Sequence, residues 1–302
     1  MAKFVREKYN QTKYYQNESA FRIIKRELFQ DRLALVCFIF MVMLVTFIII
    51  FSLVTDSSEI LSSNFNVFRL QPASRQHILG TDGSGRDNFA ILVIATRNSL
   101  ILIAIIATVS GVIGIIYGLI AGYLGGIYDN LMMRVVEGIS TLPILVLIIA
   151  LLPLIPGTPI VSFATLMILL TWTGVAKVVR VKLVQEKELE YIQASKTLGT
   201  AHFKIIFSQL LPNLSTDIIA GVTLNTATVA AVEAALSILG FGFTRATPTL
   251  GTLISPFDNL VIFLRHYSIM WMPPTIVLVL IIFSINTIGN MLTRVADARQ
   301  RR

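Results

Sequence analysis

Residues 190–213 read EYIQASKTLGTAHFKIIFSQLLPN, and this polar segment lies between two strongly apolar stretches of the chain. The carboxylates of Glu186, Glu188 and Glu190 precede or open a first short helix, where they suit the positive end of the helix dipole. Gly199 is expected to end that helix, because glycine permits a left-handed backbone and a sharp reversal of the chain. The segment therefore predicts two short helices joined by a turn.

A second, amphipathic helix is predicted after the turn. Thr200 can cap this helix, and an apolar face follows helical spacing at Phe203, Ile206, Phe207 and Leu210. We expect that face to lie against the rest of the protein or against an interface. Pro212 is expected to end the segment, so a push on the first helix would reach the next apolar stretch through a stiff joint. A docking element and a solvated charged loop both fit these residues.

Composition places the chain in a membrane. The 302 residues are 55% hydrophobic and 14% charged, and the mean hydropathy is +0.75. One ordinary soluble core cannot bury that much apolar surface, so lipid must cover it. The net charge of +8 does not indicate a nucleic-acid-binding protein, because the basic residues flank apolar segments and do not gather in a domain with interleaved aromatic residues.

Six apolar stretches meet or approach the roughly 20 residues that a helix needs to cross a bilayer core of about 30 Å. The sequence therefore predicts an all-α membrane protein with spans at 33–54, 100–123, 135–154, 162–179, 218–239 and 270–292. Prolines at positions 143, 153, 156 and 159 interrupt the third and fourth spans. Small residues in the second span, including Gly114, Gly118 and Gly122, are expected to let neighbouring helices approach closely.

Lysine and arginine gather in three regions that we predict to share one side of the membrane: an arm at 1–32, the loop at 180–213 and a tail at 293–302. The positive-inside rule puts these regions, and hence both termini, in the cytoplasm of a multi-pass protein of the cell membrane. Residues 55–99 then form an extracellular loop, and residues 100–292 a core of five spans. The first span is too long for a signal peptide and is expected to remain as an anchor.

Sequence patterns for catalysis and metal binding are absent. Cys37 is the only cysteine, and His77, His202 and His266 lie far apart without a metal-binding spacing. The chain has neither a Gly-x-x-x-x-Gly-Lys-Ser/Thr phosphate loop nor a Gly-x-Ser-x-Gly elbow. We therefore expect no catalytic residue, no cofactor and no metal site, and the energy for any work must come from a partner.

Two polar residues in the fifth span are candidates for lining a passage. The 1.5 Å rise of a helix places Glu233 roughly 22 Å above the cytoplasmic start of the span, where a carboxylate needs a partner or water. Asn225 lies eight residues earlier, near enough to the same helical face to share a polar seam with Glu233. Two alternative roles remain for Glu233: it lines a passage, or it makes a structural hydrogen bond to a neighbouring helix. Near the inner side, Asp129 and Arg134 are expected to form an ion pair.

The loop at 190–213 resembles the EAA loop of binding-protein-dependent ABC importer permeases, whose pattern is Glu-Ala-Ala, three residues, Gly, nine residues and Ile-x-Leu-Pro. Gln193, Ala194 and Ser195 fill the triplet, and Gly199 and Pro212 follow at the required distances. Two positions depart from the pattern: Gln193 replaces the Glu of the triplet, and Gln209 replaces the Ile near the end. The resemblance implies that the loop docks a cytoplasmic ATPase through Glu190, Tyr191, Gln193, Ala194, Ser195, Leu198, Gly199 and Pro212.

Three further segments resemble oligopeptide and dipeptide permeases of the C-subunit type. Residues 77–87, HILGTDGSGRD, match every fixed position of the signature Leu-Gly-Thr-Asp-x-x-Gly-Arg-Asp that precedes the second span in that family. Residues 122–129, GYLGGIYD, resemble the turn between its second and third spans. Residues 233–242, EAALSILGFG, resemble the segment that ends its fifth span.

The resemblance implies a six-transmembrane-helix bundle of the type I ABC importer permease class. It implies that the chain is a subunit of an importer for oligopeptides or dipeptides and is not itself an enzyme. The implied partners are a second homologous permease, two cytoplasmic ABC ATPases, an extracellular peptide-binding protein and membrane lipid. Nickel, a metallophore or another small solute stays open as the substrate. A non-transporting membrane scaffold and an unrelated secondary transporter are the other function classes, although we find no inverted repeat typical of the latter.

Overall fold

The computed structural model describes residues 20–56, 60–61, 71–241, 243, 247–255 and 268–300. All regular elements in these residues are helices, as the sequence predicts. The helices are α2 (Ala20–Gln30), α3 (Arg32–Val54), α5 (Asn88–Leu124), α6 (Gly126–Thr141), α7 (Ile144–Leu151), η1 (Leu152–Leu154), α8 (Pro159–Glu186), α9 (Glu190–Thr197), α10 (His202–Ile205), η2 (Ile206–Leu210), α11 (Leu211–Asn213), α12 (Ser215–Ile238), α13 (Leu250–Ile254) and α15 (Ser268–Gln300).

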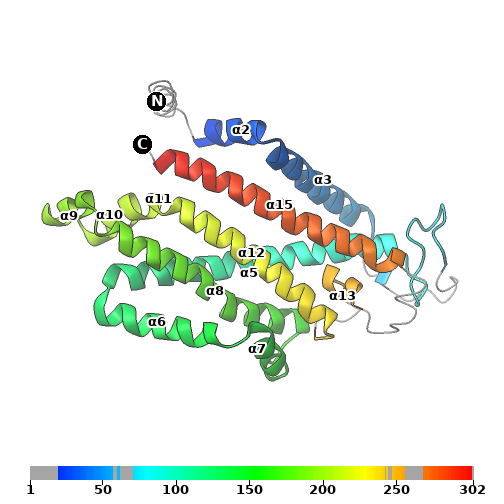
Figure 1. Ribbon diagram of the computed structural model, residues 1–302. Coiled ribbons are helices and arrows are strands. Elements are labelled where there is room, and N and C mark those ends of the chain that lie inside the picture. Colours follow the sequence, from blue (N-terminus) through cyan, green and yellow to red (C-terminus); the bar gives the residue numbers. More distant parts are fainter. Residues whose placement is uncertain are drawn as a thin grey trace.

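The long helices lie side by side and run in roughly one direction (Figure 1). Helices α9 and α10 lie at one end of the bundle, and α13 lies toward the other end. The start of α2 and the end of α15 lie toward the same end as α9. The first described helix therefore begins, and the last one ends, toward the same end of the bundle as α9, while the side of the membrane on which this end lies stays a prediction.

Five helices are long and apolar enough to cross a membrane, namely α3, α5, α8, α12 and α15. Helix α6 and the α7–η1 segment supply a sixth span when the pair is counted as one, but the two parts meet at an angle of 82°. The break lies at Leu142 and Pro143, because proline cannot donate to the helix ladder and disfavours helical geometry in the residue before it. The predicted third span at 135–154 is therefore a bent pair of helices.

The helices extend beyond several predicted boundaries. Helix α5 begins at Asn88 and not at residue 100, because the Asp87 carboxylate caps it by accepting hydrogen bonds from the N–H groups of Phe89 (2.7 Å) and Ala90 (3.2 Å). Residues 88–99, the last part of the predicted extracellular loop at 55–99, are thus helical. Helices α8 and α15 likewise continue past their predicted ends.

The HILGTDGSGRD segment folds into the turn that starts α5. The buried Asp82 carboxylate accepts hydrogen bonds from the N–H groups of Ser84 (2.8 Å) and Arg86 (2.9 Å), and it pairs with the Arg86 guanidinium at 2.7 Å. His77 Nδ1 lies 2.8 Å from Asp87 Oδ2. The charged residues of the segment therefore bond to one another and fix the direction in which the chain enters α5.

Glycines on α5 bring this helix into close contact with α8. A Cβ at Gly114 would lie 2.6 Å from the carbonyl oxygen of Trp172, and a Cβ at Gly118 would lie 2.6 Å from that of Ala176. Carbon atoms in contact prefer separations of about 3.5–4.0 Å, so only glycine fits at this crossing. The prediction that these small residues serve close helix packing is confirmed.

Candidate functional site

The loop between α8 and α12 contains the predicted reversal. At the end of α9 the N–H of Gly199 donates to the carbonyl of Lys196 at 3.0 Å, and the N–H of Thr200 donates to that of Ser195 at 3.1 Å. This pair of bonds is a Schellman motif. Gly199 has φ = +75°, a left-handed conformation that glycine adopts without a Cβ clash. The predicted left-handed reversal at Gly199 is therefore confirmed.

The second half of the loop differs from the prediction. Ala201 is the N-cap of α10 and no side chain caps that helix, so the predicted capping by Thr200 is wrong. The chain then forms the π-helical turn η2 and stays helical through Pro212 and α11. Proline removes one N–H from the helix ladder and clashes with the preceding turn, and the π turn lies directly before α11, which contains Pro212. Pro212 consequently joins the loop to α12 and does not end the segment.

The π turn also splits the apolar face that was predicted for this helix. Leu210 is buried, whereas Phe203 and Phe207 are 69% and 50% exposed, and their ring centroids lie 4.3 Å apart. Ile205, which is not part of the predicted face, is fully buried. A π turn takes in an extra residue and so rotates the side chains that follow it. Both aromatic rings, one before the π turn and one within it, lie on the surface of the loop.

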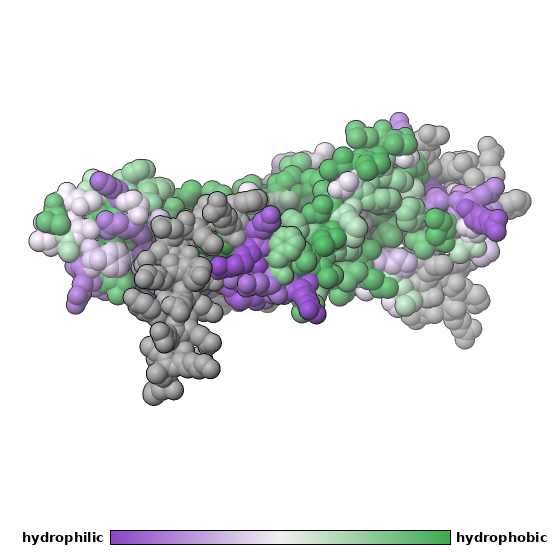
Figure 2. Space-filling view, turned by 90° about the horizontal axis from the view of Figure 1, so that it is seen from above, coloured by the Kyte–Doolittle hydropathy of each residue, from purple (hydrophilic) through white to green (hydrophobic). Residues whose placement is uncertain are grey.

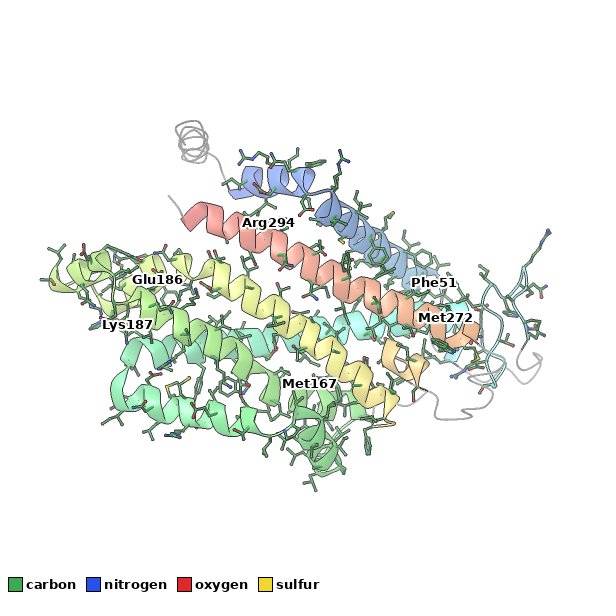
Figure 3. All side chains as sticks on the ribbon, viewed as in Figure 1. Phe51, Met167, Glu186, Lys187, Met272 and Arg294 are labelled. Carbon is green, nitrogen blue, oxygen red and sulfur yellow. The ribbon has the colours of Figure 1, made fainter. Side chains whose placement is uncertain are left out.

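Tyr191 ties the two ends of the loop together. Its OH group donates to Glu186 Oε2 at 3.1 Å and accepts from Asn213 Nδ2 at 2.6 Å. Partial burial raises the pKa of the Tyr191 phenol above its usual range, which is already well above neutral pH. The side-chain amide of Gln193 donates to the carbonyl of Lys187 at 2.9 Å. Figure 3 shows Glu186 and Lys187 at the end of α8, beside this loop.

The outward side of α9 is partly apolar. Leu198 is 84% exposed, and Leu189, just before the helix, is 44% exposed. The other residues predicted to contact an ATPase are exposed or half-buried: Glu190, Ala194 and Ser195. Together with the two exposed phenylalanine rings, Leu189 and Leu198 make this end of the described chain suitable for contact with another protein.

The inward side of the loop packs against three long helices. A buried cluster joins side chains of α5 and α8 to four leucine and isoleucine residues of the loop region: Ile192, Ile205, Leu210 and Leu214. Tyr123 OH, in the last turn of α5, lies 2.5 Å from His202 Nδ1. Lys187 Nζ donates to the carbonyl of Gly122 at 2.8 Å. The loop is therefore attached to α5 and α8 as well as to α12.

An ion pair near the same end links α6 to α8. Asp129 Oδ2 lies 2.5 Å from Arg180 Nη2, and Asp129 Oδ1 accepts from Arg180 Nε at 3.0 Å. Arg134, the partner expected from the sequence, instead lies 3.8 Å from Glu137 on an exposed surface. The predicted pairing is wrong because Arg180 approaches Asp129 from a different helix.

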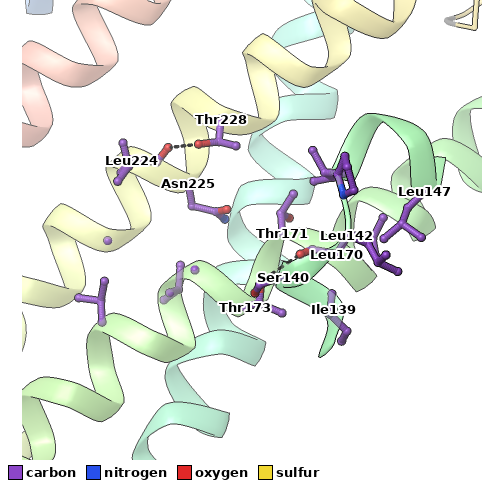
Figure 4. Close-up of a pocket in the computed structure, with 16 residues that line it drawn as sticks. Ile139, Ser140, Leu142, Leu147, Leu170, Thr171, Thr173, Leu224, Asn225 and Thr228 are labelled. Atoms are coloured by element: carbon purple, nitrogen blue, oxygen red, sulfur yellow. Dashed lines mark hydrogen bonds between the residues drawn. The ribbon is translucent and has the colours of Figure 1, made fainter. Parts of the chain in front are cut away.

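A cavity of about 450 Å³ lies between the α6–α7 break, α8 and α12 (Figure 4). Its polar lining is uncharged and consists of hydroxyl and amide side chains: Ser140, Thr171, Thr173, Asn225 and Thr228. Asn225 Nδ2 also donates to Ser110 Oγ on α5 at 2.8 Å. The described residues contain no group of three or more His, Cys, Asp or Glu side chains that could hold a metal ion.

Glu233 lies away from this cavity. Its side chain is 1% exposed, and Oε1 accepts hydrogen bonds from Thr249 Oγ1 (2.6 Å) and Ser237 Oγ (3.1 Å). Thr249 in turn caps α13. Asn225 bonds to α5 whereas Glu233 bonds toward α13, so the structure does not contain the predicted polar seam between them. One carboxylate oxygen of Glu233 thus bonds toward α13, and the other, Oε2, is buried without a hydrogen-bond partner among the described residues.

Glu233→Leu should destabilise the protein by about 1–3 kcal/mol, because it leaves two buried hydroxyl groups without their acceptor. Glu233→Gln keeps an acceptor oxygen and should cost less. Melting temperatures of the purified complex measure both effects. Thr249→Val should cost more than Glu233→Leu, because it also removes the cap of α13, and the double variant should lose less than the sum of the two single variants. Normal melting of Glu233→Leu, or altered transport by a fully stable Glu233→Gln, would instead favour a role in the passage.

Comparisons with known proteins agree with the geometry. Residues 114–302 match the family described as the binding-protein-dependent transport system inner membrane component. The oligopeptide transport system permease protein OppC of Lactococcus lactis subsp. cremoris (strain SK11) is 37% identical over 277 residues, which cover 92% of this chain and 94% of the relative. The dipeptide transport system permease protein DppC of Bacillus subtilis (strain 168) is 35% identical over 235 residues, which cover 76% of this chain and 71% of the relative.

A solved structure of the MetNI methionine ABC transporter in an inward-facing conformation shares the fold. The two superpose with a TM-score of 0.52 and 18% sequence identity, covering 69% of this chain and 97% of that chain. The predicted class, an all-α permease bundle of the type I ABC importers, is confirmed. By the match over residues 114–302 and by the 37% identity to OppC over 92% of its length, the chain belongs to the family of binding-protein-dependent transport system inner membrane components.

Proposed function

We propose that this chain is the transmembrane subunit of an ATP-driven ABC importer that takes up oligopeptides or dipeptides. The observation that carries the proposal is the folded loop α9–α11, which packs against three long helices and leaves Leu198, Phe203 and Phe207 exposed at one end of the bundle. The peptide substrate is supported by the similarity to OppC over nearly the whole chain and to DppC over most of it.

The loop is the part of this subunit that would receive force from a cytoplasmic ATPase. Docking would bury its exposed leucine and phenylalanine side chains, which favours binding. Because the inward side of the loop packs against α5, α8 and α12, displacement of the loop would move these three helices together. We therefore favour a rigid movement of the three-helix unit over tilting of the fifth span alone.

The cavity beside the α6–α7 break is the best candidate for this subunit's share of the passage. Its lining offers hydroxyl groups and the amide of Asn225 but no fixed charge. Such a surface can exchange hydrogen bonds with a peptide backbone and does not select against either charge of a peptide side chain. A second homologous permease would close the passage, and an extracellular binding protein would deliver the peptide.

Uptake by a reconstituted complex tests the proposal. Proteoliposomes that contain this chain, a second permease and two ATPases, with the binding protein at the outer face, should accumulate a labelled oligopeptide only when ATP reaches the ATPases. Omission of this chain should abolish accumulation. Accumulation of nickel or a metallophore without peptide would contradict the proposed substrate, and ATP hydrolysis without uptake of any solute would favour a scaffold.

The proposed orientation, with both termini and the loop α9–α11 in the cytoplasm, predicts one-sided chemical labelling. In a Cys37→Ser background, a cysteine at Ser84 should react with an impermeant maleimide in intact, wall-stripped cells. A cysteine at Thr200 should react only after permeabilisation, because the two positions lie at opposite ends of the bundle. Equal labelling of Thr200→Cys in intact cells would reverse the orientation.

A further inference from the structure

We propose that the junction of α2, α3 and α15 binds the headgroups of anionic phospholipids. Asp31 holds this junction together: its carboxylate caps α3 by accepting from the N–H groups of Leu33 and Ala34 at 3.1 Å, and it pairs with Arg294 of α15. Figure 3 shows Arg294 in the last part of α15, next to α2. The inner side of the junction is therefore fixed to the bundle.

Helix α2 has one covered face and one open face. Ile23 is fully buried in a cluster with Met291 and Val295 of α15. Lys25 and Phe29 lie roughly on the opposite side of the helix, given 3.6 residues per turn, and Phe29 is 61% exposed. An aromatic side chain that the described chain leaves open beside a membrane span needs an apolar neighbour, and lipid acyl chains supply one.

The open face of α2 continues into the lipid-facing surface of α3. Leu33 and Val36 are 62% and 63% exposed. Helix α3 is the least buried of the five long spans, because only 17% of its most apolar stretch is buried against the rest of the described chain. Figure 2, which views the molecule from the side of α2 and α3, shows a hydrophilic patch next to a wide hydrophobic surface. This change from polar to apolar surface is typical of the boundary between headgroups and acyl chains.

Two basic side chains flank the exposed ring and give the junction its preference for negative charge. Lys25 precedes Phe29 by four residues and Arg32 follows it by three, and both are exposed. The nearby carboxylate of Asp31 is engaged by Arg294 and by the cap of α3. Lysine and arginine can lay their apolar stems along the acyl region and keep their charges at headgroup level, where each attracts anionic lipid.

Fluorescence quenching by brominated lipids tests the proposal on the full complex. A bimane label at Phe29→Cys, in a Cys37→Ser background, is reconstituted into vesicles of mixed phosphatidylcholine and phosphatidylglycerol, with only one of the two lipids brominated. We expect brominated phosphatidylglycerol to quench about threefold more strongly than brominated phosphatidylcholine, since each basic residue favours anionic lipid. Lys25→Glu with Arg32→Glu should bring this ratio to about one.

Two controls separate headgroup binding from general effects. A label at Val45→Cys, on the exposed surface farther along α3, should be quenched equally by both lipids and should show that the charge-reversed variant is still inserted. Arg134→Glu, on the exposed surface of α6, should leave the ratio at position 29 unchanged. Equal quenching by the two lipids would overturn the proposal. Absence of quenching by either lipid would also overturn it, because a protein partner would then cover the junction.

Discussion

Gly118→Leu should prevent the chain from accumulating as a folded membrane protein, because the crossing of α5 and α8 has no room for a side chain. A Cβ at this position would lie 2.6 Å from the carbonyl oxygen of Ala176 and 2.9 Å from Val179 Cβ. The first of these contacts is with backbone, which cannot move aside by a change of rotamer. We expect Gly118→Ala to cost about 1–3 kcal/mol and the leucine to exceed the small net stability of a folded protein. Size-exclusion profiles and thermal denaturation of the purified complex measure these effects.

Two other glycine-to-alanine changes in long helices serve as controls. At Gly111, on the same helix, the nearest atom to a new Cβ is a methyl carbon of Val222 at 3.4 Å, which is an ordinary contact. At Gly174, on α8, nothing lies within 4 Å of a new Cβ. Both alanine variants should melt close to the wild type. If Gly118→Ala melts as they do, α5 and α8 do not cross as closely as the structure indicates.

The features that could be predicted from the sequence depend on local rules. Apolar stretches of sufficient length predict membrane helices whatever they contact. Gly199 predicts a reversal because the left-handed conformation is a property of one residue. The repeated spacing of Gly114 and Gly118 predicts a groove, since residues four apart share a helix face. Sequence alone does not tell which helix fills that groove, and the structure assigns α8.

Features that arise between distant segments could not be read from the sequence. Asp129 pairs with Arg180, which is remote in the chain, and sequence spacing could offer only the nearby Arg134. The cavity residue Thr171 was missed because a threonine in an apolar span can satisfy its hydroxyl on its own helix, as Thr171 does by donating to the carbonyl of Met167 at 2.6 Å. The π turn before Pro212 shifts the loop's apolar face in a way that regular helical spacing does not anticipate.

Gly199→Val should reduce uptake about tenfold or more while the chain still inserts and the ATPases still hydrolyse ATP. A residue with a Cβ costs about 1–2 kcal/mol in the left-handed conformation, and a β-branched residue is disfavoured further. A penalty of that size shifts the population of the turn roughly 5–30-fold. Because the turn sets the position of α9 relative to α10, the exposed leucine and phenylalanine side chains would no longer present the surface that we propose to dock the ATPase. Parallel assays of ATP hydrolysis and solute uptake in proteoliposomes measure the loss of coupling.

The environment of Gly199 makes the cause of this loss identifiable. Nothing lies within 4 Å of a Cβ built at Gly199, so a substituted side chain meets free space and acts only through the backbone. Gly118 is the opposite case, because its backbone is ordinary helix and its space is filled. Asparagine tolerates the left-handed conformation better than other residues that carry a Cβ, so Gly199→Asn should retain most uptake, with Gly199→Ala between Asn and Val. If uptake instead falls with side-chain size, in the order Ala, Asn, Val, the effect is a steric clash with the ATPase. The conformation of the turn would then have no part in coupling.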